Sequence, residues 1–177
     1  TYNEQVLINK QLTIQSSGGA AVTIIDGEEG TANEFQIDYA EPPPNAPPGI
    51  IYRYYPVVRV DNDGVVFDGF TVQGATPIIK LLDEPTPYEC GMGIAILASN
   101  CHIENNSIPE NPWAIFVEGS ANVISGTTTL GNLQADKPSF IGIWFGGNNN
   151  QITANNLTGG GIGIFGIGQS NDIADNI

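Results

Sequence analysis

Two carboxylates and one imidazole are the clearest candidates for chemistry in this chain. Asp68 and Glu104 are 36 residues apart, and His102 lies two residues before Glu104. Two carboxylates held close together raise the pKa of one of them, as a general acid requires, or they attract Ca²⁺, which relieves their repulsion. The alternative is a solvated pair whose side chains turn apart. Either chemistry requires elements that bring these residues side by side.

A second acidic group, Asp61-Asn62-Asp63-Gly64, resembles the start of a calcium-binding loop. It lacks the remaining ligands and the distal glutamate of an EF-hand. Asp and Asn also favour ordinary turns, because their side chains hydrogen-bond the nearby backbone. Ca²⁺ is the one ion that we consider, and we expect no required cofactor. Its candidate ligands are Asp61, Asp63, Asp68 and Glu104.

Three aromatic residues, Phe116, Trp144 and Phe165, each follow an isoleucine, and Arg59 occupies the equivalent position earlier in the chain. Aromatic rings that face solvent at regular spacing would form a stacking platform for sugar rings, or an apolar patch that docks a partner. The alternative is that the segment 131–139 or a neighbouring chain covers them, because large exposed apolar patches are uncommon.

All of these candidates lie in or beside a repeat of short strands. Each copy has a strand of the type G-I-x-I, a turn rich in Ser, Asn and Gly, and a second strand of the type I-x-x-N-x-I. Successive second-strand anchors are 36, 21, 28 and 21 residues apart, so the bare repeat is 21 residues long. In five copies the first anchor precedes the second by nine residues: Val58 and Phe67, Ile94 and Ile103, Ile115 and Ile124, Ile143 and Ile152, Ile164 and Ile173.

A strand repeat of this length indicates a solenoid, in which each coil pairs with the coils above and below and none is stable alone. We predict an all-β fold, a right-handed single-stranded parallel β-helix over residues 1–177. This single domain is expected to be a fragment or processed part of a longer chain. The first anchors should stack as one buried column and the second anchors as another, because a register shift would flip every side chain.

Stacking also aligns the residues that follow the anchors. The three aromatic side chains should form one outward column with Arg59. Asp68 and Glu104 should lie on adjacent coils, with His102 on the same face, unless an insertion parts these coils.

Asparagine recurs three residues after the second anchor, at Asn106, Asn155 and Asn176. Phe70 and Thr127 occupy the equivalent positions in two other coils. Stacked side-chain amides satisfy backbone groups of a turn that would otherwise lack partners. We therefore predict an interrupted asparagine ladder at an inward turn.

The residues in excess of 21 lie in three insertions, 28–57, 75–92 and 131–139. Insertions should stay outside the solenoid, and loops on a rigid scaffold often carry function.

The composition excludes several classes of protein. The chain has 22 Gly, 12 Pro and one Met, which favours tight turns over helices. A net charge of −14 repels nucleic acid and anionic membrane surfaces. No apolar run is long enough to span a bilayer, so we expect neither nucleic-acid binding nor membrane insertion.

Two cysteines and two sequons carry further reactive groups. The spacing of Cys90 and Cys101 demands neither a disulfide nor a metal site, so two unpaired thiols are expected. N-x-S/T sequons begin at Asn105 and Asn156, with chance occurrence in an Asn-rich chain as the alternative to glycosylation.

The segments YNEQVLINKQLTIQ, TIIDG, VVFDGFTV and IENNSI resemble those of right-handed parallel β-helix proteins of the NosD-like and pectate-lyase-like superfamily. The resemblance covers nearly the whole chain and implies a location outside the cytoplasm: extracellular, at the cell surface or periplasmic. The superfamily includes polysaccharide lyases, glycoside hydrolases, epimerases, pectin esterases, adhesins and surface proteins without known catalysis. The catalytic motifs of its pectin methylesterases, polygalacturonases and pectate lyases are missing from this sequence.

Three functions follow from these patterns. The first is a non-catalytic structural, adhesive or polysaccharide-binding module, whose partners are polysaccharide or other chains of a surface assembly. The second is a polysaccharide-active enzyme, a lyase, hydrolase or epimerase, that uses Asp68, Glu104 and His102. Its weakness is the scatter of five basic residues, since lyase chemistry on uronates needs charge neutralisation. The third is a filament subunit that associates end to end through unpaired strand edges.

Overall fold

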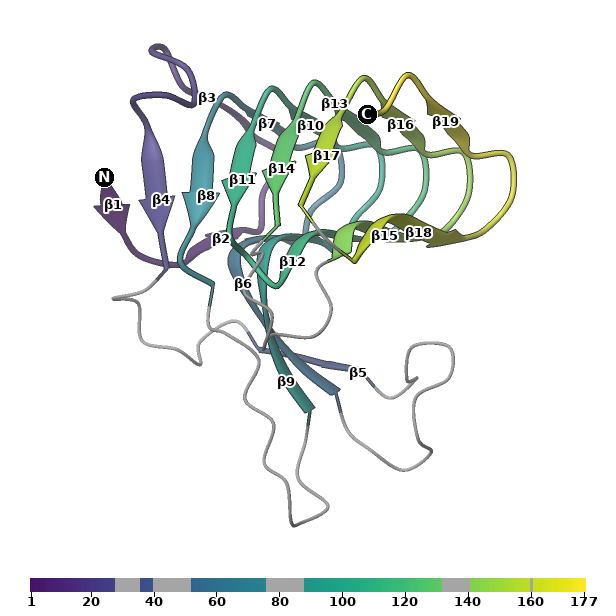
Figure 1. Cartoon of the computed structure of the whole chain (residues 1–177), viewed down its shortest axis with the longest axis horizontal. Coiled ribbons are helices and arrows are strands. Elements are labelled where there is room, and N and C mark those ends of the chain that lie inside the picture. The colour runs from purple at the N-terminus through teal and green to yellow at the C-terminus, as the bar shows by residue number, and fades with distance from the viewer. Residues whose placement is uncertain (28–35, 40–51, 76–87, 132–140, 160) are drawn as a thin grey trace.

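Three parallel sheets form the walls of a stacked coil in the computed structural model of this chain (Figure 1). The structure describes residues 1–27, 36–39, 52–75, 88–131, 141–159 and 161–177. Sheet A contains β1 (Tyr2–Asn3), β4 (Ile24–Asp26), β8 (Thr71–Gln73), β11 (Ser107–Pro109), β14 (Thr128–Leu130) and β17 (Asn156–Thr158). Sheet B contains β2 (Val6–Ile8), β6 (Tyr52–Val60), β9 (Tyr88–Ile96), β12 (Trp113–Glu118), β15 (Ile141–Gly146) and β18 (Ile162–Ile167), with β5 (Ile37–Tyr39) added beside β6. Sheet C contains β3 (Thr13–Gln15), β7 (Val66–Asp68), β10 (His102–Glu104), β13 (Val123–Ser125), β16 (Gln151–Thr153) and β19 (Asp172–Ala174).

Each coil contributes a strand to sheet A, then to sheet B and then to sheet C. This arrangement confirms the all-β parallel solenoid, and no helix occurs among the described residues. The sequence pattern predicts two strands per coil, whereas the structure has three. The I-x-x-N-x-I pattern spans two strands, as in β10 and β11, which are separated by a turn at Asn105 and Asn106.

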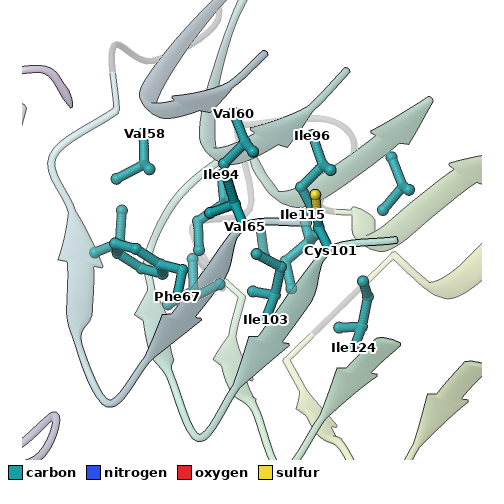
Figure 2. Close-up of a cluster of buried hydrophobic side chains, with 14 of the residues drawn as sticks. Val58, Val60, Val65, Phe67, Ile94, Ile96, Cys101, Ile103, Ile115 and Ile124 are labelled. Atoms are coloured by element: carbon teal, nitrogen blue, oxygen red, sulfur yellow. The ribbon is translucent and has the colours of Figure 1, made fainter. Parts of the chain in front are cut away.

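Both predicted anchor columns are present in register. Val58 pairs with Ile94, which pairs with Ile115, and the column continues through Ile143 to Ile164. The second column runs in the same way from Phe67 to Ile173. Figure 2 shows the two columns meeting inside the solenoid. Their side chains are buried except in the last described coil, where Ile164 is half-buried and Ile173 is 50% exposed.

In each of the five coils after the first, two turns place one residue in the left-handed region of backbone space, with φ between 53° and 80°. Gly, Asn and Asp adopt this region at low cost, which explains the Asn- and Gly-rich turns of the sequence. Ala121, Ala154 and Ser170 adopt it too, held by the paired strands on both sides. The first turn uses Gly64, Asn100, Ala121, Asn149 and Ser170; the second uses Gly69, Asn105, Gly126, Ala154 and Asp175.

The predicted asparagine ladder is confirmed at the turn between sheets C and A. Asn106 Oδ1 accepts from the backbone N–H of Phe70 at 2.9 Å, and its Nδ2 donates to the Phe67 carbonyl at 3.1 Å. Asn155 bonds Thr127 N–H and the Ile124 carbonyl in the same way, both at 3.0 Å. Asn176 repeats the pattern on the next coil.

A second asparagine ladder, not predicted from the sequence, lies at the turn between sheets B and C. Asn122 Oδ1 accepts from Cys101 N–H at 2.9 Å, and its Nδ2 donates to the Ala98 carbonyl at 3.0 Å. Asn150 and Asn171 do the same on the following coils. The carbonyl that receives each amide lies against a glycine of the next coil, such as Gly119 over Ala98, where a Cβ would collide with the oxygen.

All three insertions join a strand of sheet A to the following strand of sheet B. Most of their residues (28–35, 40–51, 76–87 and 132–139) lie outside the described residues. Within the predicted insertions the structure places β5 and much of β6 in 28–57 and the start of β9 in 75–92. β6 and β9 pair from Tyr52 and Tyr88 onward, and β5 pairs antiparallel with β6. We call β5 with residues 52–56 and 88–92 the blade, which projects from the coils in Figure 1.

Candidate functional site

The aromatic column has the predicted register on the outer face of sheet B. Phe116 pairs with Ala95 and Trp144, and Trp144 pairs with Phe165. The rings of Phe116 and Trp144 stack at 4.6 Å with an interplanar angle of 11°. Arg59 continues the column through Ala95.

Two of the three rings are covered, which is the alternative to a solvent-facing platform. Phe116 is 1% exposed and Trp144 is 9% exposed, whereas Phe165 is half-buried. Tyr54 of the blade lies 5.0 Å from the ring of Trp113 and 6.0 Å from that of Phe116. The ring faces are therefore used in packing, and no sugar can stack on Phe116 or Trp144 in this conformation. The segment 132–139, proposed as a cover, lies outside the described residues.

The column belongs to a second apolar core outside the solenoid, which we call the outer cluster. It joins residues of the coils to residues of the blade. Its buried members are Ile37, Tyr54, Cys90, Met92, Ala95, Trp113, Phe116, Ile141 and Trp144. The sequence repeat predicts the column of Phe116 and Trp144, and it gives no sign of the blade residues that cover it, because Tyr54, Ile37 and Cys90 lie in the insertions.

Arg59 ties the blade to the solenoid. Its Nε donates to Asp61 Oδ1 at 2.7 Å, and its Nη1 donates to the backbone carbonyl of Gln36 at 3.1 Å. Gln36 directly precedes β5. The Arg59 guanidinium, which was predicted to bind ligand, thus holds the start of the blade. Asp61 was predicted as a calcium ligand, and one of its oxygens is ion-paired with Arg59.

Asp63 is also used within the turn between sheets B and C. Its Oδ1 accepts from the backbone N–H of Ser99 at 2.7 Å. Ser99 Oγ in turn accepts from Ser120 N–H, and Ser120 Oγ accepts from Asn148 N–H. The described part of the chain holds no group of three His, Cys, Asp or Glu residues that could bind a metal ion. Residues 61–64 form a turn in which Asp61 and Asp63 each accept a hydrogen bond from within the chain.

The two carboxylates of the predicted acidic corner are brought together. Glu104 pairs in register with Asp68 on the adjacent coil, so the 75–92 insertion does not part these coils. Each carboxylate has other polar partners. Asp68 accepts from Gln15 Nε2 at 2.6 Å and from Asn105 Nδ2 at 3.0 Å, and His102 Nδ1 lies 3.3 Å from Glu104 Oε1. Asp68 therefore has an amide donor on each oxygen, and Glu104 has the imidazole beside one oxygen.

Two residues of the outer face, Glu118 and Trp113, were missed by the sequence reasoning. Glu118 is half-buried at the end of β12, and burial raises its pKa. The indole of Trp144 lies against Gly146, the residue that pairs with Glu118. Trp113 Nε1 is buried without a hydrogen-bond partner. Glu118 could have been found from the sequence, because it follows Phe116 by two residues and must lie on the same face of the strand. Trp113 could not, because no other coil has a tryptophan at the equivalent position.

Both cysteines are buried and unpaired, as predicted. Cys90 lies in the outer cluster and Cys101 in the inner core. Burial raises the pKa of both thiols, and for Cys90 it does so far beyond the ordinary range. Neither side chain is a reactive thiolate at neutral pH, because the thiolate is the form that reacts.

Three parallel sheets in stacked coils define a parallel β-helix. Among the described residues no helix is long and apolar enough to cross a membrane. Comparisons with protein-family models, with curated proteins and with solved structures found no match to this chain.

Proposed function

We propose that this chain is a non-catalytic solenoid of the cell exterior or cell surface, whose blade serves a structural, adhesive or polysaccharide-binding role. One observation carries the proposal: all three insertions enter at the same corner, between sheets A and B, and two of them contribute to a paired sheet. Insertions placed at random would be spread over the three corners. Their gathering at one corner is typical of a scaffold that presents a binding surface.

The blade is built to be held in a fixed orientation. Its strands β6 and β9 continue directly into the solenoid, so the blade and coils share backbone hydrogen bonds. The outer cluster packs Tyr54 against Trp113 and Phe116, and Arg59 bonds the residue before β5. A rigid projecting sheet loses little conformational entropy when it binds a partner.

The narrower kinship with NosD-like and pectate-lyase-like proteins is part of this proposal. It is supported by the three-sheet coil and by the length of the repeat. Superfamily membership favours polysaccharide as the partner and a location outside the cytoplasm, and it leaves the activity to be tested at the site.

Retention on insoluble cellulose, chitin and pectin tests the binding role. We expect the intact chain to be retained on at least one of these polymers. Arg59→Ala should weaken that retention, because the start of β5 loses its hydrogen bond to Arg59. His102→Ala, on the opposite sheet C, is the matched control and should behave as the parent. Equal retention of the parent and Arg59→Ala, or no retention on any polymer, would contradict a polysaccharide-binding blade.

A polysaccharide-active enzyme is the second candidate, because the register places Asp68 beside Glu104. The test is cleavage of acidic and neutral polysaccharides by the parent chain, Asp68→Asn and Glu104→Gln. Activity abolished by either substitution would establish the enzyme in place of the non-catalytic module. Ca²⁺ at this corner would instead raise the melting temperature of the parent without turnover.

A filament subunit is supported by apolar side chains on the faces of the first and last described coils. Ile167 is 57% exposed and Ile162 is 44% exposed in the last coil, and Leu12 is 47% exposed in the first. Head-to-tail association through these faces predicts a sedimentation coefficient that rises with protein concentration. Ile167→Lys should abolish that rise, because a charge at the paired edge is costly to bury.

A further inference from the structure

The sequon that begins at Asn156 lies on an open sheet face. Asn156 and Thr158 are both exposed on the outer face of β17, and Leu157 between them is half-buried. The Asn156 side chain makes no hydrogen bond to any described residue. Thr158 Oγ1 donates to the Thr129 carbonyl at 3.3 Å, within the same sheet. The two residues that a sequon requires therefore share one solvent-facing side of a strand.

The sequon that begins at Asn105 lies at a turn, where the exposed Asn105 side chain is hydrogen-bonded to a neighbouring coil. Asn105 has a left-handed backbone, with φ of 53°, and its Nδ2 donates to Asp68 Oδ1 at 3.0 Å on one neighbouring coil. On the other neighbouring coil its carboxamide lies against Gly126, where an added Cβ would be 2.7 Å from Asn105 Oδ1. A substituent on Nδ2 would displace this carboxamide from between the two coils.

We propose that Asn156, and not Asn105, carries an N-linked glycan when the chain is exported through a pathway that glycosylates sequons. The inference rests on the proposed location outside the cytoplasm. Asn156 Nδ2 forms a bond to the anomeric carbon of a lipid-pyrophosphate-linked oligosaccharide. The carbon–oxygen bond to the pyrophosphate breaks, the lipid pyrophosphate leaves, and Nδ2 loses one proton. The glycan then stands on sheet A, whereas the blade belongs to sheet B.

The test is secretion of the whole 177-residue chain, behind a cleavable secretion signal, from a eukaryotic cell line that glycosylates sequons. Intact mass before and after enzymatic removal of N-glycans gives the occupancy. Asn156→Gln and Thr158→Ala are compared with the matched pair Asn105→Gln and Ser107→Ala. The added secretion signal sends the chain through the glycosylation pathway whatever its natural location is. The result is therefore independent of the proposed function, which polymer retention tests.

We expect one glycan on the parent chain, its loss in Asn156→Gln and Thr158→Ala, and its persistence in Asn105→Gln and Ser107→Ala. The melting temperature should be unchanged by glycan removal, because the face has no contact to lose. A secreted parent chain without glycan, or with glycan on Asn105, would overturn the proposal. So would a glycosylated chain whose far-ultraviolet circular dichroism differs from that of the deglycosylated chain.

Discussion

The inner core and the outer cluster are both buried and apolar, yet they arise in different ways. The inner core takes Ile, Val and Phe from each coil at positions that recur with the repeat. The outer cluster takes side chains from three coils and from the blade. Its coil members pair in register, but Ile37, Tyr54 and Cys90 come from segments outside the repeat. Strand alternation determines which side chains leave the inner core. What those side chains then meet depends on segments outside the repeat.

The two regions should also differ in how they unfold when a side chain is truncated. The inner columns are shared by all three sheets, so damage there breaks the stacking on which every coil depends. The outer cluster joins the blade to one sheet, and the blade can loosen while the coils stay stacked. The substitutions below, taken from the largest expected effect to the smallest, break or sharpen this difference.

Ile115→Ala should give the largest loss. Ile115 is fully buried between Ile94 and Ile143, and truncation of such a side chain costs about 2–5 kcal/mol of unfolding free energy. Equilibrium unfolding in guanidinium chloride measures the change. The control is Val123→Ala, a half-buried residue on the outer side of sheet C, which should lose much less. Equal losses for both would mean that the anchor column is not the core of the stack.

Phe116→Ala, one residue further on, should destabilise the blade more than the coils. The substitution removes the ring that contacts Trp144 and Tyr54, which leaves a cavity on the outer face. Hydrogen exchange read by mass spectrometry should show faster exchange in 52–56 and 88–92. Exchange in β13 and β16 should stay as in the parent. Faster exchange across all three sheets would show that the two cores unfold as one unit.

The two cysteines allow the same substitution in both regions. Cys101 lies at the place that Asn122 occupies one coil later, and its Sγ is 3.5 Å from the Asn62 carbonyl. Cys101→Asn should extend the second ladder, with Nδ2 donating to Asn62 and Oδ1 accepting from Val65 N–H, and should gain about 1 kcal/mol. Cys90→Asn should lose about 1–3 kcal/mol, because the outer cluster offers no ladder partners. Thermal unfolding of the two variants measures the contrast, and a loss in both would refute the ladder assignment at 101.

Glu118→Gln should have the smallest effect, and one that depends on pH. Burial raises the pKa of Glu118 in the folded chain above its unfolded value, so between the two pKa values the folded state binds more protons than the unfolded state does. The stability contribution of the carboxyl is therefore full at low pH and falls as the pH rises. Melting temperatures across pH 3 to 8 should show the variant gaining on the parent above the window and matching it below. A constant difference at all pH values would mean that the carboxyl is fully solvated when folded.

Much of the inner architecture could be predicted, because it repeats. The anchor columns and the ladder at Asn106, Asn155 and Asn176 recur at fixed offsets. The second ladder also has a fixed offset, two residues before the second anchor, but Val65 and Cys101 occupy that offset in the earlier coils and hide the pattern. The third strand was missed because a short turn at Asn105 and Asn106 was taken as part of one strand.

The sequence predicted how the candidate residues align from coil to coil, but not what surrounds their side chains. The register of Phe116 with Trp144 and of Asp68 with Glu104 follows from the repeat. The burial of the aromatic rings does not, because Tyr54 lies in an insertion whose pairing with β9 has no periodic signal. The hydrogen bond of Asp68 to Gln15 was also hidden, since the first coil departs from the nine-residue spacing of the others.

The asparagine ladders give the folding process a direction. In both inner ladders the side chain reaches back, so that Asn122 bonds groups of the Cys101 coil and Asn155 bonds groups of the Thr127 coil. An amide of this kind has its partners only after the preceding coil has formed. Each new coil pairs its strands with those of the previous coil, and its asparagine side chain hydrogen-bonds the backbone groups at that coil's turn. When winding begins at the amino-terminal side, only the most recently formed coil has turn backbone groups without asparagine partners. A chain that emerges from a ribosome or an export channel presents its coils in that order.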